Sequence, residues 1–156
     1  MPWDMQGADA VVNEPEQSPA RTAEMPEQRD REYRAAHAAG VAFAEKGDYS
    51  SAMRAFEVAL SLRPDSTDAL FNLGACHEAI GDPARAVNIY RRVLEITPDD
   101  PDCFANLGTS FIKMYHREKS PVWRRMARDA WERSLELNPG QAKVKEYLAR
   151  TESLDG

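Results

Sequence analysis

Residues 67–100 read TDALFNLGACHEAIGDPARAVNIYRRVLEITPDD, and this stretch aligns with both of its neighbours at a fixed offset of 34 residues. The offset relates Gly74 to Gly40 on one side and to Gly108 on the other. A repeat of this length is typical of stacked supersecondary units. Further matches on the N-terminal side place Ala86 on Ala52, Tyr90 on Phe56 and Pro98 on Pro64.

Each repeat has the pattern of two helices. From residue 31 onward, apolar residues recur at spacings of three and four, which predicts helices and gives no strand pattern. In the central repeat, Asp82 and Pro83 are suited to the cap and first position of the second helix. Small residues such as Gly74 and Ala86 indicate that the two helices cross closely. The expected fold is all-α, with repeats at residues 33–66, 67–100 and 101–141.

The third repeat is longer than the others. Its landmarks Ala127, Trp131 and Pro139 lie 41 residues after their counterparts in the central repeat, so seven residues are inserted between its two helices. Seven residues are about two helical turns. Ser120 and Pro121 have the cap and first-position pattern of an earlier helix start. The sequence therefore predicts helices over residues 101–117 and 121–137.

The two ends of the chain differ in character. Residues 1–30 contain four prolines among acidic and polar residues, and such a segment buries too little apolar surface to offset its ordering entropy. We expect a disordered acidic tail there and a folded domain over residues 31–156. Residues 142–153 predict an amphipathic capping helix, because the last unit of a stack needs a cover for its apolar face.

Composition narrows the class of function. The chain has 156 residues and a formal charge of −6, which argues against a nucleic-acid partner, since phosphate binding depends on dense Lys and Arg. No run approaches the roughly 18 apolar residues of a membrane-spanning helix, and the N-terminus lacks a secretory pattern. We expect a cytoplasmic protein. Cys76 and Cys103 have no metal spacing and are expected to be buried, so no metal or cofactor is predicted.

The sequence has no recognisable catalytic motif. It lacks a nucleophile paired with a base, a glycine-rich phosphate loop and paired carboxylates at a suitable spacing. His77 and Cys76 are adjacent, and adjacent residues of a helix point in different directions. We therefore expect a binding protein that is not an enzyme.

The repeat landmarks resemble the tetratricopeptide repeat (TPR) family. Each 34-residue unit of the family has an aromatic or large apolar residue at position 4, Leu-Gly at positions 7 and 8, an aromatic at 11, Ala at 20, an aromatic at 24, Ala at 27 and Pro at 32. The central repeat has Leu70, Leu73, Gly74, His77, Ala86, Tyr90, Val93 and Pro98 at these positions. The third has Phe104, Leu107, Gly108, Phe111, Ala127, Trp131, Ser134 and Pro139, and the first has Ala36, Ala39, Gly40, Phe43, Ala52, Phe56, Ala59 and Pro64.

The resemblance implies a right-handed superhelix whose first helices line a groove for a peptide or helix of a partner protein. The expected function is then that of a scaffold, assembly factor or chaperone, with Phe71 as the leading anchor. The alternative is that many groove positions are only solvated helix faces. The implied groove residues are Arg34, His37, Val41, Glu45, Asp68, Phe71, Asn72, Ala75, Glu78, Asp102, Asn106, Thr109, Ile112 and Lys113.

One known ligand class of the family does not fit this sequence. TPR domains that hold the carboxylate tail of chaperones use Lys, Asn and Arg at five groove positions. Here those positions are His37, Val41, Asn72, Asp102 and Asn106, of which Asn72 alone matches. Because Asp102 would repel a carboxylate, we expect that this groove does not bind such tails.

A basic segment follows in the third repeat. Residues 113–128 contain six basic residues and one acidic residue, which we name the basic tip. It could bind an acidic protein segment, a membrane surface or RNA, or it could be a solvated end of the hairpin. An alternative function follows, in which the acidic tail and the basic tip join copies of the chain into a structural assembly. The tip residues are Arg117, Lys119, Arg124, Arg125 and Arg128, together with Lys113.

Overall fold

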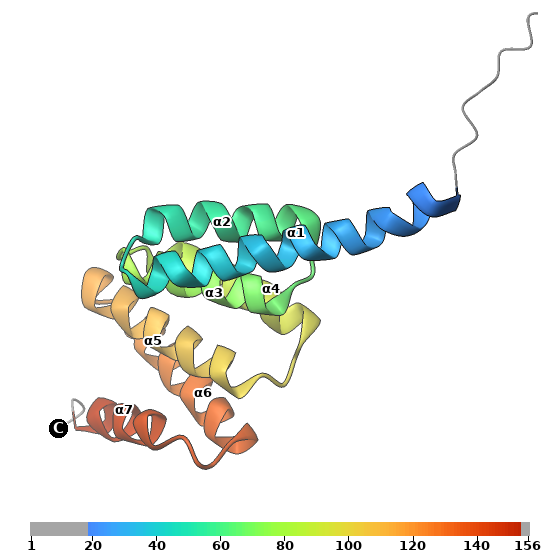
Figure 1. Cartoon of the computed structure of the whole chain (residues 1–156). Coiled ribbons are helices and arrows are strands. Elements are labelled where there is room, and N and C mark those ends of the chain that lie inside the picture. The colour runs from blue at the N-terminus through green and yellow to red at the C-terminus, as the bar shows by residue number, and fades with distance from the viewer. Residues whose placement is uncertain (1–18, 154–156) are drawn as a thin grey trace, which may run out of the picture.

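The computed structural model describes residues 19–153, with side chains described from residue 25 onward, and this part of the chain is all-α without a strand. Figure 1 shows the helices as a stack of hairpins that runs from α1 to α7. Their bounds are α1 Pro19–Glu45, α2 Tyr49–Leu62, α3 Thr67–Ala79, α4 Pro83–Ile96, α5 Pro101–Glu118, α6 Pro121–Leu137 and α7 Ala142–Glu152.

The stack is built from three helix hairpins and one single helix. α1 packs on α2, α3 on α4 and α5 on α6, while α2 also packs on α3 and α4 on α5. α7 packs on α6 and closes the stack (Figure 1). Val144 of α7 is buried, and the Tyr147 ring lies 5.4 Å from the Trp131 ring, so α7 covers the apolar face of the third hairpin as expected.

In each hairpin, a glycine packs against an aromatic ring. The glycine lies on the first helix and the ring on the second, and no room remains between them for a side chain. This confirms the close helix crossing expected at these small residues. A Cβ built on the glycine would lie 2.6 Å from Phe56 at Gly40, 2.7 Å from Tyr90 at Gly74 and 2.4 Å from Trp131 at Gly108.

The inserted residues of the third repeat lengthen both of its helices. α5 and α6 have 18 and 17 residues, against 13 and 14 in α3 and α4, which agrees with the expected bounds. The residue after α5, Lys119, is its C-cap and has a φ of 56°, the left-handed conformation common after a helix. Ser120 precedes α6, but its side chain makes no cap hydrogen bond, unlike Asp82 and Asp100 at the starts of α4 and α5.

The expected boundary of the N-terminal tail is wrong. α1 begins at Pro19 and passes through Pro26, so residues 19–30 are helical, and they extend beyond α2 in Figure 1. Arg29 donates to the Leu62 carbonyl at 3.3 Å, and Asp30 forms ion pairs with Arg34 and Arg63. These contacts anchor the helix, and strong helix formers continue it past the proline. Residues 1–18, where the tail is also expected, lie outside the described residues.

The buried core runs through the whole stack. Its largest cluster joins α3 to α7 around Tyr90, Phe111 and Trp131. Two smaller clusters join the first hairpin to α3. Cys76 and Cys103 are both buried and free, as expected, and burial raises the pKa of the Cys103 thiol to about 12.

Candidate functional site

A row of three cavities follows the first helices of the hairpins and continues onto α7. Their volumes are about 250, 530 and 490 Å³. The first lies between α1, α3 and α5, the second between α3, α5 and α7, and the third between α5, α6 and α7. Thr109 and Tyr147 line both the second and the third cavity. The Gln141 amide of the second cavity donates to Asp102 of the first at 2.8 Å. We name this continuous row the groove.

The first cavity is acidic and has one aromatic wall. Three carboxylates, those of Asp68, Asp100 and Asp102, line it together with Phe71. None of the three is ion-paired within residues 25–153, although Asp100 accepts the amide of Cys103 at 3.0 Å. The half-buried Phe71 ring lies 5.7 Å from the Tyr90 ring. The cavity is therefore suited to a group that is positively charged or flat and apolar.

Opposite this acidic rim, the amide of Asn72 and the imidazole of His37 are in contact. Asn72 Nδ2 and His37 Nε2 are 3.3 Å apart. The imidazole also stacks on the Tyr33 ring, with ring centres 5.9 Å apart, and lies at 5.6 Å from the Phe56 ring. These contacts link α1 to α3 and fix both side chains at the wall of the cavity.

The second cavity contains Glu78, whose carboxylate connects three helices. Lys113 donates to it at 2.7 Å, the buried Ser110 hydroxyl at 3.3 Å and the Tyr90 hydroxyl at 3.5 Å. Asn106 donates to the same Tyr90 hydroxyl at 3.3 Å. Burial, followed by the charge of Glu78, raises the pKa of Tyr90 above its ordinary range. Glu78 is thus at the groove, but its oxygens already accept hydrogen bonds from α4 and α5.

The third cavity is apolar with a basic rim. Ile112, Trp131 and Tyr147 provide its apolar surface, and His116 and Arg150 lie at its edge. The Trp131 indole is fixed, because Nε1 donates to the Ala105 carbonyl at 3.0 Å. This end of the groove is suited to an apolar side chain beside a negative charge.

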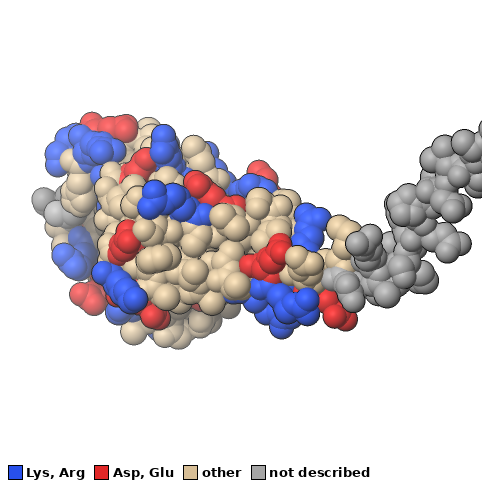
Figure 2. Space-filling view, turned by 45° about the horizontal axis from the view of Figure 1, so that its top comes forward, with Lys and Arg blue, Asp and Glu red and all other residues tan. Residues whose placement is uncertain are grey.

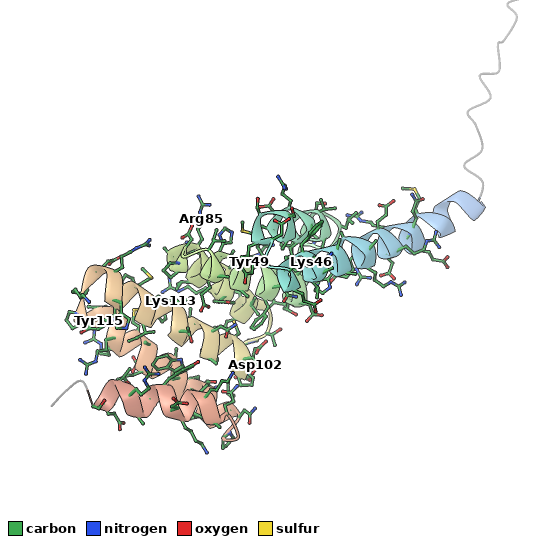
Figure 3. All side chains as sticks on the ribbon, turned by 60° about the vertical axis from the view of Figure 1, so that its left-hand side comes forward. Lys46, Tyr49, Arg85, Asp102, Lys113 and Tyr115 are labelled. Atoms are coloured by element: carbon green, nitrogen blue, oxygen red, sulfur yellow. The ribbon has the colours of Figure 1, made fainter. Side chains whose placement is uncertain are left out.

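Most of the expected groove residues line the three cavities. Figure 3 shows Asp102 at the start of α5, near α7, and Lys113 further along the same helix. The residues that line a cavity are His37, Asp68, Phe71, Asn72, Glu78, Asp102, Asn106, Thr109 and Ile112. The residues that line none of the three are Arg34, Val41, Glu45, Ala75 and Lys113. Arg34 pairs with Asp30, Lys113 pairs with Glu78, and Val41 packs against the core beside Phe56.

The sequence predicted α7 only as a cover for the apolar face of the third repeat. Its contribution to the groove was not predicted. α7 occupies the place of a first helix in a further repeat. Its groove residues can be found by adding the 41-residue offset of the third repeat to the groove positions of α5. For positions 102, 106, 109 and 112 this operation gives Lys143, Tyr147, Arg150 and Ser153, each of which lines the second or third cavity, while position 113 gives Leu154, which lies outside the described residues.

Several residues of the basic tip contact neighbouring elements of the fold, and Arg124, Arg125 and Arg128 line one shared cavity. Arg117 donates to the Gly81 carbonyl at 3.4 Å, and Arg124 donates to the Thr151 carbonyl of α7 at 3.1 Å. Arg128 pairs with Glu152 of α7 at 3.8 Å, and Lys119 lies over the Tyr115 ring at 6.0 Å. On the face that Figure 2 shows, basic and acidic side chains are interspersed over the body of the molecule. Several residues of the basic tip therefore form hydrogen bonds or ion pairs with neighbouring elements.

Among residues 25–153, no three His, Cys, Asp or Glu side chains are grouped so that they could bind a metal ion. None of the helices in this part of the chain is long and apolar enough to cross a membrane.

Comparison with known proteins identifies the class. Residues 43–106 match the family described as Tetratricopeptide repeat. No curated protein matches the sequence. The first TPR domain of Spaghetti (RPAP3) bound to the HSP90 peptide SRMEEVD is similar in structure, with a TM-score of 0.72, 15% identity, and coverage of 81% of this chain and 95% of that one.

Two other solved structures show the same architecture. The second TPR domain of human RPAP3 in complex with the HSP70 peptide SGPTIEEVD has a TM-score of 0.68 and 15% identity, over 80% of this chain and 98% of that one. MamA has a TM-score of 0.72 and 15% identity, over 88% of this chain and 76% of that one.

Stacked helix hairpins around a groove define a helical-repeat protein of the solenoid class. Within that class, the chain is similar to tetratricopeptide repeat proteins over residues 43–106, and its described helices form three hairpins and a C-terminal capping helix. Its all-α, right-handed solenoid fold is the one that the repeat landmarks predict.

Proposed function

We propose that the groove binds a peptide or helix of a partner protein, and that the chain acts as a scaffold, assembly factor or chaperone. The observation that supports this proposal most directly is the continuity of the groove from α1 to α7. Such a row of connected cavities matches the shape of a polypeptide segment, and the half-exposed Phe71 and Tyr147 provide aromatic anchors along it.

The ligand of this groove differs from those of the two peptide-bound neighbours. The peptides SRMEEVD and SGPTIEEVD of those complexes both end in Glu-Glu-Val-Asp, which has three carboxylate side chains. In this chain Asp68, Asp100 and Asp102 line the first cavity. Like charges brought close together repel each other. We therefore propose a partner segment that does not end in a run of carboxylates at this position.

Site-specific photo-crosslinking tests the proposal. A benzophenone amino acid replaces the exposed Asp68 at the groove, and a matched control protein carries it in place of the exposed Glu57 on α2. In extracts of the source cells, the Asp68 probe should crosslink to a partner polypeptide, and the Glu57 probe should not.

Two outcomes would count against a groove for partner proteins. Equal crosslinking from both positions, or none from Asp68, would contradict the proposal. Crosslinking of Asp68 to copies of this chain alone would favour the alternative in which the protein assembles with itself.

A further inference from the structure

The charge of the groove changes sign along its length. At the first cavity, Asp68, Asp100 and Asp102 bring three negative charges together, without an ion-pair partner in residues 25–153. The N-termini of α3 and α5 both lie at this cavity and contribute about half a positive charge each. That partial charge is about one unit in total, so the cavity keeps a net negative charge of about two.

The opposite end of the groove is positive. Arg150 and His116 lie at the rim of the third cavity, and Lys143 lies in the second. Arg150 and Lys143 are exposed, and neither is ion-paired within residues 25–153. In the same third cavity, Ile112, Trp131 and Tyr147 form an apolar wall. The groove therefore offers a negative site, then an apolar site with positive charge beside it.

The aromatic wall of the first cavity favours a cation further. The face of an aromatic ring attracts a guanidinium or ammonium group electrostatically. Phe71 lines the same cavity as the three carboxylates, and it is half-buried. A Lys or Arg side chain in this cavity would contact carboxylates and a ring together.

The helix geometry fixes the spacing between the two sites. Asp102 in the first cavity and Ile112 in the third lie ten residues apart on the same helix, α5. At 1.5 Å per residue, this separation is about 15 Å. An extended peptide covers about 3.3 Å per residue, so it spans the same distance with about four to five residues.

We propose that the groove binds an extended protein segment with a defined charge pattern. A Lys or Arg of the segment occupies the first cavity, an apolar side chain four to five residues away occupies the third, and a carboxylate lies next to Arg150. This inference rests on the proposed function and specifies the chemistry of the partner. The groove charges do not fix the chain direction of the segment, so either direction satisfies the pattern.

The probe is a blocked, fluorescein-labelled peptide, acetyl-KRSGSLWSEE-amide, measured by fluorescence anisotropy together with the same sequence in reverse. One control replaces the Lys-Arg pair by Gln-Gln, a second replaces it by Glu-Glu, and a third replaces the C-terminal Glu pair by Gln-Gln. At least one direction of the probe should bind about tenfold tighter than the Glu-Glu control. The difference should shrink as salt is added, because salt screens exposed charges.

Variants of the protein assign each preference to one end of the groove. Asp68→Asn with Asp102→Asn should abolish the preference for Lys-Arg over Gln-Gln, because the change keeps the side-chain shape and removes the charge. Arg150→Gln should abolish the preference for the Glu pair over Gln-Gln. Glu57→Gln and Arg125→Gln, at exposed positions outside the three cavities, are the matched controls and should leave both preferences unchanged. Melting curves of all variants check folding.

Two results would overturn this inference. The first is that the Glu-Glu control binds as tightly as the probe. The second is that none of the peptides binds at about 1 mM. A groove-specific crosslink at Asp68 alongside either result would leave the proposed function standing. If the crosslink were also missing, the proposed function would fail together with the charge pattern.

Discussion

Gly108 and Trp131 are in direct contact across the third hairpin, and a Cβ on Gly108 would lie 2.4 Å from Nε1 of the indole. The same Nε1 donates a hydrogen bond to the Ala105 carbonyl at 3.0 Å, one turn earlier on the helix of Gly108. The glycine therefore makes room for the ring, and the ring binds the backbone that the glycine leaves accessible. Equivalent pairs at Gly40 and Gly74 explain why a small residue and an aromatic recur together in every repeat.

Gly108→Ala should destabilise the fold. The added methyl would displace the indole and weaken its hydrogen bond, and overpacking of this kind costs about 1–3 kcal/mol. Urea unfolding measures the free-energy difference. Gly140→Ala is the matched control, because a Cβ built on this exposed glycine would have Asn138 Oδ1 as its nearest neighbour, at 3.2 Å. Equal stability of Gly108→Ala and wild type would contradict the role of this contact.

Glu78 should act as a stabilising residue independently of any ligand. Its side chain is 14% exposed, and Glu78→Ala would leave the buried Ser110 hydroxyl without its acceptor, at a cost of about 1–3 kcal/mol. Lys113→Ala removes the exposed partner of the same ion pair and should cost at most about 1 kcal/mol. Chemical denaturation compares the two variants. A larger loss for Lys113→Ala than for Glu78→Ala would show that the ion pair, and not the buried hydroxyl, dominates.

Two neighbouring residues of the basic tip should behave differently. Arg124→Ala removes the hydrogen bond to the Thr151 carbonyl and should loosen α7, with a loss of about 1–3 kcal/mol. Arg125→Ala, at an exposed position, should change stability by less than about 0.5 kcal/mol. Hydrogen exchange in α7 provides the local readout. Faster exchange in both variants, or in neither, would contradict the assignment of Arg124 to the support of α7.

Stability should fall at high pH in part because of Cys103. Burial, and then the charge of Asp100, raises the pKa of its thiol from the ordinary value of 9.0 to about 12. Between about pH 9 and about pH 12 the folded state therefore keeps a proton that the unfolded state loses, so the free energy of unfolding decreases as pH rises. Below about pH 9 the thiol contributes no slope.

Urea midpoints at pH 7.5, 9 and 10.5 measure this effect in wild type and in Cys103→Ala. In the variant, the free energy of unfolding should fall less steeply above pH 9 than in wild type. Part of the fall should remain, because burial also raises the pKa of Tyr90. Identical slopes in the two proteins would contradict the contribution of Cys103.

Local sequence signals were sufficient for the repeat architecture. The caps Asp82 and Asp100 and the residues Pro83 and Pro101 place helix starts through contacts within one turn. The seven-residue insertion predicts the longer third hairpin because two added turns preserve the phase of two antiparallel helices. The predicted boundary of the N-terminal tail was wrong because the contacts that hold this part of the chain are not local. Four prolines among acidic and polar residues predicted a disordered tail, but the contacts from Arg29 and Asp30 to the end of α2 are long-range and are not visible in a local pattern.

The groove was predicted only in part. Positions such as Asp68, Phe71 and Asn72 follow from the repeat and line a cavity. Ala75 and Glu45 follow from the same rule but line none of the three cavities, because the rule gives the direction of a side chain and not the shape of the space in front of it. Nothing in the local pattern showed that Glu78 accepts hydrogen bonds from two other helices.

The sequence by itself determined the helices, their pairing and the three-repeat stack, because these depend on periodicity, caps and the fit of a glycine against an aromatic ring inside one hairpin. The tertiary structure alone decided that Arg29 and Asp30 of α1 contact the end of α2, that α7 lines the groove and how charge is distributed along it. Those features depend on side chains from different repeats meeting in space, and the rotation between successive hairpins sets which of them meet.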